Sequence, residues 1–273
     1  MSEHVMNRMT EEEYRQSPAV NKSTLWEIRK SPAHYKWAVD HQGEEEDTPA
    51  MKMGRAVHMS VLQPEEFAEH YAVGPDIGRN TKEGKATWAV FLAENERKEI
   101  LTLSEYVQII NISKAVMEGT PRIPWYDAET EVPIFWDDPR TGIRCKARVD
   151  AIIAERNRTR VIDLKTTNDA STDAFTRDAI RYGYHVQAAH YLNGVKVARP
   201  DLKNPEWWFV AVEKKPPYAV NVIKAGDDFI DAGQFKLMTL MDKLDECMRI
   251  DQYPGYGENV MKTPAWVMEG DFE

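Results

Sequence analysis

Apolar positions recur at helical spacing through the first third of the chain. A Ser23 or Thr24 cap predicts one helix there, and Ser31 followed by Pro32 predicts the start of the next. The acidic stretch 41–49 predicts a loop. Further helices are predicted from about Met53 to Pro64, over residues 81–98 and over residues 103–118.

The periodicity changes after Pro121. Alternating apolar and polar residues predict strands over 131–136, 143–153 and 160–166, with a turn over 137–142. Helices are predicted over 172–181, 184–198 and 227–249, strands over 207–212 and 218–223, and irregular structure after the last helix. This order predicts an α/β (α+β) fold with a central mixed β-sheet flanked by helices and a helical N-terminal region.

The second predicted strand has two chemically different faces. Because side chains alternate along a strand, four apolar residues share one face: Ile143, Cys145, Ala147 and Val149. The opposite face carries Arg144, Lys146, Arg148 and Asp150. That face is expected to be basic, with a single carboxylate at its end.

The composition is that of a globular protein. Of 273 residues, 42% are hydrophobic and 29% are charged, and no apolar run approaches the roughly 20 residues that cross a bilayer. The polar N-terminus resembles no signal peptide, which predicts a cytoplasmic protein without a membrane partner. We expect one domain over 1–273, with a mainly helical part (20–120), a sheet part with its following helices (121–225), and a C-terminal helix and tail (226–273).

Two bulk features limit the chemistry. Cys145 and Cys247 are widely separated, which argues against a zinc site, an iron–sulfur cluster or a disulfide framework. The formal net charge of −10 argues against nucleic-acid binding by the surface as a whole, because phosphate contacts need clustered Lys and Arg. A locally basic channel in a protein that is acidic overall remains compatible with this net charge.

One acid-x-lysine triplet stands out by its context. Asp163, Leu164 and Lys165 follow two apolar residues in a predicted strand, and Asp150 lies one hairpin earlier. Alternation places Asp163 and Lys165 on the same face. Two carboxylates brought together suit Mg²⁺, and a lysine beside it can orient or deprotonate an attacking water. A salt bridge between Lys165 and an Asp at a strand edge explains these residues equally well without catalysis.

Together the motifs resemble those of a known superfamily. Gly142-Ile-Arg-Cys-Lys-Ala-Arg-Val-Asp150 followed by Val161-Ile-Asp-Leu-Lys-Thr-Thr167 resembles the core of the PD-(D/E)xK nucleases, particularly the RecE-type exodeoxyribonucleases (exodeoxyribonuclease VIII-like) of phages and prophages. Three other motifs match in order: a helix pair from Ser23 to Tyr35, Gly54-Arg-Ala-Val-His58, and Gln187-Ala-Ala-His-Tyr191, which resembles a QxxxY motif. The chain departs from the usual pattern in having Val149 before the first carboxylate and Asp163 in place of Glu.

The resemblance implies roles for individual residues and a restriction-endonuclease-like core. It makes Asp150, Asp163 and Lys165 catalytic, and it makes His58, Asp150, Asp163 and the carbonyl of Leu164 ligands of Mg²⁺, for which Mn²⁺ substitutes. Residues implied to contact DNA are Gln187, Tyr191 and Arg148. Glu131, on the preceding strand, is a secondary candidate for lining the site.

The resemblance also implies an activity. It predicts a metal-dependent exonuclease that degrades one strand of linear double-stranded DNA from 5′ to 3′ and leaves 3′ overhangs for a single-strand-annealing recombinase. Relatives assemble as rings, so a homo-oligomer of three or four chains is expected, with the face of Arg144, Lys146 and Arg148 lining its channel. The alternatives are another PD-(D/E)xK nuclease (RecB-like, Cas4-like or an endonuclease) and a catalytically silent DNA-binding protein on the same fold.

Overall fold

The computed structural model describes residues 9–43 and 47–263. Residues 44–46 of the predicted acidic loop and the tail from residue 264 lie outside the described residues. None of the helices within the described ranges is both long and apolar enough to cross a bilayer.

The N-terminal helices begin at polar caps. Helix α2 (Lys22–Glu27) is capped by Asn21, whose carboxamide oxygen accepts a hydrogen bond from the Thr24 backbone at 2.9 Å. The predicted Ser23 or Thr24 cap is therefore wrong, because Asn21 already satisfies the free amide of that first turn. Helix α3 (Pro32–Asp40) begins at its Ser31 cap as predicted, and a short helix before them, α1 (Glu11–Gln16), was not predicted.

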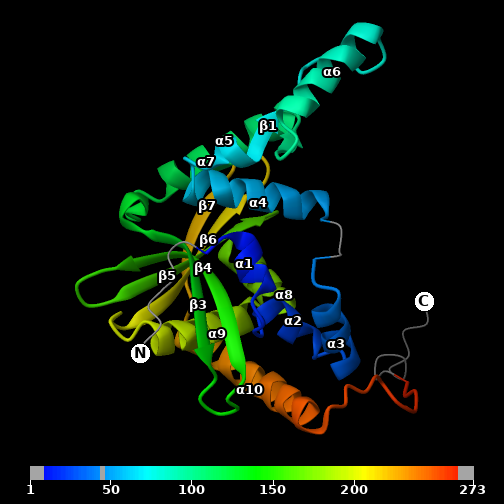
Figure 1. Cartoon of the computed structure of the whole chain (residues 1–273). Helices are drawn as coiled ribbons and strands as arrows, with labels where there is room; N and C mark the ends of the chain where they lie inside the picture. The colour runs from blue at the N-terminus through cyan, green and yellow to red at the C-terminus, as the bar shows by residue number, and fades with distance from the viewer. Residues whose placement is uncertain (1–8, 44–46, 264–273) are drawn as a thin grey trace, which may run out of the picture.

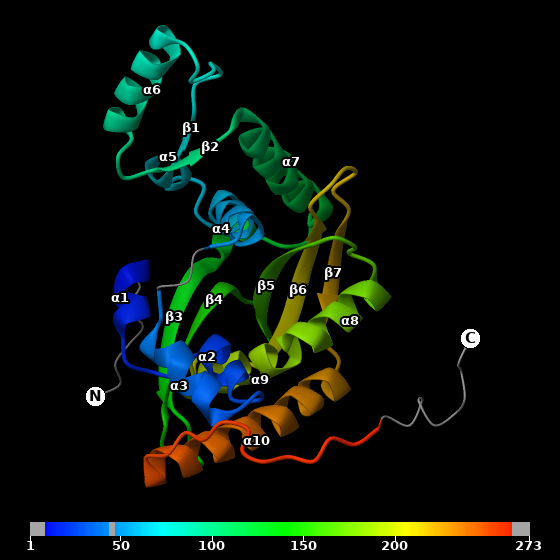
Figure 2. The same ribbon diagram turned by 90° about the vertical axis from the view of Figure 1, so that its right-hand side faces the viewer.

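The next segment contains more elements than its helical pattern predicted. Helix α4 (Pro49–Leu62) starts earlier than the predicted Met53 because Thr48 caps it and Pro49 occupies its first turn. The predicted helix 81–98 ends at Glu94, and its last residues, 95–98, form a turn before the next strand. The segment comprises α5 (Phe67–His70), β1 (Tyr71–Val73), α6 (Lys82–Glu94), β2 (Glu99–Leu101) and α7 (Leu103–Gly119). In Figures 1 and 2, α6 projects away from the rest of the molecule beyond the short parallel β1–β2 pair.

A five-stranded mixed sheet forms the centre of the molecule, as predicted. The strands lie in chain order: β3 (Glu129–Asp137), β4 (Arg144–Ala154), β5 (Thr159–Thr167), β6 (Pro205–Glu213) and β7 (Val220–Lys224). Only β5 and β6 are parallel, and their connection contains α8 (Thr172–Tyr182) and α9 (Tyr184–Ala198). The chain then continues into α10 (Asp227–Ile250), close to the predicted 227–249.

Helices cover both faces of the sheet. The apolar face of β4 packs with α2, α3, α9 and α10, and on that side lie Cys145, Ala147 and Val149, as the alternation predicted. On the other side, α4 and α7 pack over Ala151 and Ile153 of the same strand. Figure 2 shows the sheet between these two helical layers. Up to Val149, the odd-numbered side chains of β4 pack on one side of the sheet, and from Ala151 onward they pack on the other side. Asp150 therefore lies at the boundary between the two cores.

The central strands separate at the same position. β4 pairs with β5 only from Ala151 opposite Ile162 to Ala154 opposite Thr159, whereas β5 continues alongside β6 to Thr167. Beyond this fork, Val20 of the N-terminal segment forms a parallel bridge to Cys145. Asp150 and Asp163 are thus the first residues of their strands past the end of the shared ladder.

Candidate metal and catalytic site

Where β4 and β5 separate, a backbone amide of β5 donates to a side chain of β4 instead of to its backbone. At the fork the amide of Leu164 donates a hydrogen bond to Oδ2 of Asp150 at 2.8 Å. A ladder bond is thereby replaced by a charge-assisted one, which fixes the Asp150 carboxylate beside the backbone of β5. The two strands therefore hold Asp150 next to the triplet that contains Asp163 and Lys165.

His58 reaches the fork from α4. Its Nδ1 lies 3.6 Å from Oδ2 of Asp150, the carboxylate that accepts from the Leu164 amide. Val57 and Val61 anchor this helix in the core between α4, α7 and the sheet. Packing of α4 on the sheet thus brings together three residues that the resemblance assigned to a metal: His58, Asp150 and Leu164.

Glu131 joins this group more closely than the sequence predicted. Ligand atoms of His58, Glu131 and Asp150 all lie within 4.8 Å of one another. The β3–β4 register aligns Glu131 with Asp150, because Thr130 pairs with Ala151 and Val132 with Val149. Glu131 has a φ of 50°, a left-handed conformation that a non-glycine residue adopts at some cost and that is enriched at functional sites. Counting residues across the predicted turn 137–142 would have placed Glu131 opposite Arg148, because the observed hairpin pairs Asp137 with Arg144 and so shifts the register by two residues.

Asp163 is engaged by the catalytic candidates around it. Nζ of Lys165 lies 2.7 Å from its Oδ1 and 2.6 Å from its Oδ2, and Nε2 of Gln187 donates to Oδ1 at 2.6 Å. Asp163 and Lys165 share one face of β5, as alternation predicted, and Gln187 approaches from α9. The Asp163 side chain is only 2% exposed, and Lys165 and Gln187 supply polar contacts to its carboxylate.

Burial and mutual repulsion perturb the carboxylates. Burial raises the pKa of Asp150 to about 7, with a further contribution from the charge of Asp163. The pKa of Glu131 is also raised, first by burial and then by Asp150. Burial together with Lys165 lowers the pKa of His58, which keeps its imidazole neutral and available as a ligand. Carboxylates held together with such raised pKa values form a site that a cation stabilises.

The donor set fits a divalent cation that accepts oxygen ligands. Two carboxylates and one imidazole converge, and burial is the main cause that raises the pKa of both carboxylates. Carboxylates suit Mg²⁺ and Mn²⁺, and an imidazole is an additional ligand more favourable to Mn²⁺. Among the described residues, no cysteine lies near this group. Cys145 is buried in the core that β4 forms with α2, α3, α9 and α10, and Cys247 is buried on α10.

The predicted DNA-contact residues lie around the carboxylates rather than on an open surface. Arg148 Nε donates to Glu131 at 2.6 Å, and its guanidinium lies 5.9 Å from the ring of Tyr14. Tyr191 is half-buried, with its ring in edge contact with Trp207 at 5.6 Å. Burial raises the pKa of Tyr191 well above its usual range, and Asp150 and Asp163 contribute.

The expected basic channel face requires a correction. Lys146 is 1% exposed, and its Nζ donates to the backbone carbonyls of Tyr14, Arg15 and Ser17. It binds the C-terminal end of α1, where the helix dipole and free carbonyls favour a cation. Lys146 therefore cannot line a channel in this structure, and the period-two pattern could not reveal that an unpredicted helix covers it.

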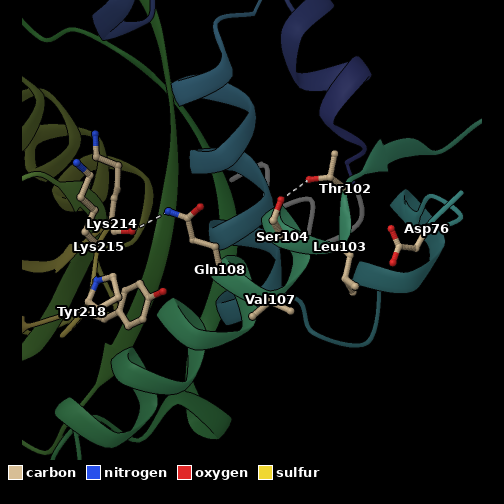
Figure 3. Close-up of a pocket in the computed structure, with 10 residues that line it drawn as sticks. Asp76, Thr102, Leu103, Ser104, Val107, Gln108, Lys214, Lys215 and Tyr218 are labelled. Carbon is tan, nitrogen blue, oxygen red and sulfur yellow. Dashed lines mark hydrogen bonds between the residues drawn. The ribbon is translucent and has the colours of Figure 1, made fainter. Parts of the chain in front are cut away.

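One concavity of the molecule contains none of these candidates. It has a volume of about 680 Å³ and lies among the start of α7, the segment with Asp76 and the β6–β7 turn (Figure 3). Nε2 of Gln108 donates to the carbonyl of Lys214 at 2.7 Å, as Figure 3 shows, which ties α7 to that turn. The concavity is a junction between elements rather than a collection of catalytic groups.

Comparison with known proteins identifies the family. A family described as a PDDEXK-like domain of unknown function (DUF3799) matches residues 21–263. The structure of a candidate exonuclease from Eubacterium rectale is similar, with a TM-score of 0.62 and 14% identity, covering 96% of this chain and 97% of that chain. A phage-related exonuclease from Haemophilus somnus 129PT has a TM-score of 0.32 and 11% identity, covering 72% of this chain and 95% of that chain. No curated protein matches.

The family match covers most of the chain and includes every residue of the fork. The similarity to the Eubacterium rectale protein shows a shared fold along nearly the full length of both chains. The mixed sheet flanked by helices is that of the restriction-endonuclease-like core. The chain belongs to the PDDEXK-like family DUF3799 and has the fold of the PD-(D/E)xK nucleases.

Proposed function

We propose that this protein is a metal-dependent exonuclease that degrades one strand of linear double-stranded DNA, from 5′ to 3′, and leaves 3′ overhangs. The observation that carries the proposal is that the fork of β4 and β5 brings His58 to Asp150 and holds Asp163 against Lys165 on the neighbouring strand, although Asp163 lies outside the group formed by His58, Glu131 and Asp150. The family match and the names of the solved exonucleases support nuclease chemistry. Strand polarity rests on the resemblance to RecE-type enzymes.

The proposed ligands of Mg²⁺ or Mn²⁺ are His58, Asp150, Asp163 and the carbonyl of Leu164, with Glu131 as an additional carboxylate. Such a cation would offset the charge that develops on the scissile phosphate. The amide of Leu164 holds Asp150 in place, and Gln187 holds Asp163. These hydrogen bonds keep the ligands in position before the substrate arrives.

Lys165 has a role that its surroundings define. Burial by itself lowers the pKa of this ammonium, but Asp163 and Asp150 outweigh burial and raise the pKa. In the protein alone Lys165 is therefore protonated and donates to Asp163. A cation bound to those carboxylates would weaken their hold on the lysine proton, which Lys165 would then release to solvent. The neutral amine would orient the attacking water and accept its proton.

The remaining candidates act on the DNA. Arg148 is proposed to contact a backbone phosphate by exchanging Glu131 for it. Tyr191 and Gln187 are four residues apart on one face of α9, and we propose that they position the strand at the carboxylates. A homo-oligomeric ring of three or four chains and a single-strand-annealing recombinase are the proposed partners, and both rest on the resemblance.

Degradation of end-labelled linear duplex DNA tests the proposal. The purified protein is incubated with Mg²⁺, Mn²⁺ or EDTA, beside a covalently closed circle. We expect metal-dependent loss of the linear DNA, early release of the 5′ label and survival of the circle. The Asp163→Ala and Lys165→Met variants should lose at least about a hundredfold in rate.

Other outcomes separate the alternatives. Cleavage of the closed circle would identify an endonuclease on the same fold. Absence of cleavage with any metal, combined with no binding of Mn²⁺ that depends on Asp150, would identify a catalytically silent DNA-binding protein. Full activity of Asp163→Ala would show that the site assignment is wrong.

A further inference from the structure

Lys165 is the first of a row of cations that lie over aromatic rings. Nζ of Lys165 lies 5.0 Å from the centre of the Tyr184 ring, and Nζ of Lys22 lies 5.8 Å from the same ring. Lys22 also lies 5.3 Å from the ring of Trp26, which carries Arg29 at 4.8 Å. The row therefore runs from the catalytic lysine through the start of α9 to α2.

A second branch of the row follows the end of α8. The Tyr182 and Tyr184 rings have centres 5.9 Å apart, and the guanidinium of Arg181 lies 5.6 Å from the Tyr182 ring. Nζ of Lys22 donates to the Tyr182 carbonyl at 2.7 Å, which joins the two branches. We call Lys22, Arg29 and Arg181, with the rings beneath them, the cationic strip.

Within residues 9–43 and 47–263, no carboxylate forms a salt bridge with Lys22, Arg29 or Arg181. Glu27, the carboxylate on the same helix as Lys22, pairs with Lys30 at 2.5 Å. Burial, Lys165 and Arg29 together lower the pKa of Lys22 to about 8, although Asp163 and Glu27 act in the opposite direction. In a chain of net charge −10, such a concentration of cations favours an anionic ligand.

The strip is held in a defined shape. Gly183, at φ 72°, forms the turn between α8 and α9, and a Cβ placed there would lie 2.8 Å from Trp26. Trp26 therefore packs directly on this turn, so α2 and the α8–α9 junction form one surface. Arg29, Arg181 and Tyr182 are exposed on it, and Lys22 is half-buried.

We infer that the cationic strip binds the sugar-phosphate backbone of a single DNA strand next to the phosphate that is cleaved. Cations backed by aromatic side chains along a narrow path are typical of sites that follow single strands without reading their sequence. A strand with one phosphate at Lys165 would meet Lys22 across Tyr184 and then Arg29 or Arg181. The inference rests on the proposed nuclease function for the position of the strand, and it assigns the strip to binding rather than to chemistry.

Binding without metal tests the strip separately from cleavage. Anisotropy of a fluorescein-labelled single-stranded oligonucleotide is titrated in EDTA at several salt concentrations with the full chain. The Arg29→Gln/Arg181→Gln double variant changes exposed side chains, which protects folding. Lys22→Gln is measured in addition. Lys203→Gln is the matched control, because Lys203 is an exposed cation in the loop before β6, at the opposite end of β5 from Lys165.

We expect the double variant to bind several-fold to tenfold more weakly than the wild type at low salt. The slope of log K against log salt should fall by about 0.7 for each lost phosphate contact, and the control should match the wild type. The inference is overturned if the wild type does not bind, or if the double variant and the control bind alike.

Cleavage assays with Mg²⁺ separate this inference from the proposed function. If the linear duplex is degraded but the double variant binds normally, only the strip is wrong. If nothing is degraded but the strip variants weaken binding, the strip stands and the nuclease proposal fails.

Discussion

At the scale of the residue, the raised pKa of Asp150 shows that this carboxylate lowers the free energy of unfolding of the metal-free protein. Its pKa of about 7 lies above the ordinary value of 3.8, mainly because of burial and also because of Asp163. At a pH between these two values, Asp150 therefore carries a proton in the folded protein, whereas the same side chain in the unfolded chain has released its proton. The free energy of unfolding should fall as pH rises from about 4 to about 7, and this contribution stays lost above that range.

Replacing this carboxylate should stabilise the metal-free protein. We expect Asp150→Asn to raise the free energy of unfolding above pH 7, by on the order of 1–3 kcal/mol, because the amide still accepts from Leu164 but carries no charge. Urea unfolding in EDTA across this pH range measures the effect. Asp231→Asn, an exposed carboxylate on α10, is the control. Added Mn²⁺ should stabilise the wild type and not the variant; a variant less stable than the wild type at every pH would contradict the argument.

At the scale of the element, glycines set how closely the helices approach. Gly233 lies where α10 crosses α9, and a Cβ there would come within 2.0 Å of the His185 carbonyl oxygen. Backbone cannot move aside as a flexible side chain can. Gln187, which donates to Asp163, lies on α9. The packing of α10 on α9 therefore also affects how firmly Asp163 is held.

The crossing gives a matched pair of substitutions. Gly233→Ala should destabilise the protein by about 1–3 kcal/mol or more, because α9 and α10 must move apart. Gly54→Ala, inside α4, places its Cβ where no atom lies within 4 Å. It should stabilise by up to about 1 kcal/mol through helix propensity. Chemical denaturation of both variants checks the prediction, and equal effects would show that α10 does not depend on this close contact.

At the scale of the whole molecule, the uneven distribution of charge is the feature that the proposed ring must accommodate. The chain carries −10 overall, yet cations gather near the fork, at Lys165, Lys22 and Arg29. A ring could turn these groups inward and the acidic surface outward. The loss of Lys146 from the predicted channel face leaves Arg144 and Arg148 of that set, and Arg148 lies at the carboxylates themselves.

The proposed ring predicts a definite mass. Light scattering should give three or four chains per particle at physiological salt. The proportion of monomer should increase at low salt, because repulsion between acidic subunits is then less screened. A monomer at every concentration and salt would rule out the ring while leaving the chemistry of the fork untouched.

The sequence predicted most elements because their signals are local. Helical spacing located α7 and α9, the polar cap at Ser31 located α3, and alternation located β3 to β6. Several elements that were missed are short: α1, α5, β1 and β2 contain too few residues for a period to emerge, and their neighbours hold them in place. Local spacing also placed Asp163 and Lys165 on one face, where the structure has them in contact.

By itself, the sequence determined which residues alternate, which segments form strands and helices, and which motifs place the chain among the PD-(D/E)xK nucleases. Tertiary structure alone decided that β4 and β5 separate at Asp150, that α4 brings His58 to this fork, and that Glu131 joins it. It also decided that α1 covers Lys146. The physical reason is range: hydrogen bonds and side-chain directions within an element follow from neighbouring residues, whereas a site between elements depends on how distant segments pack.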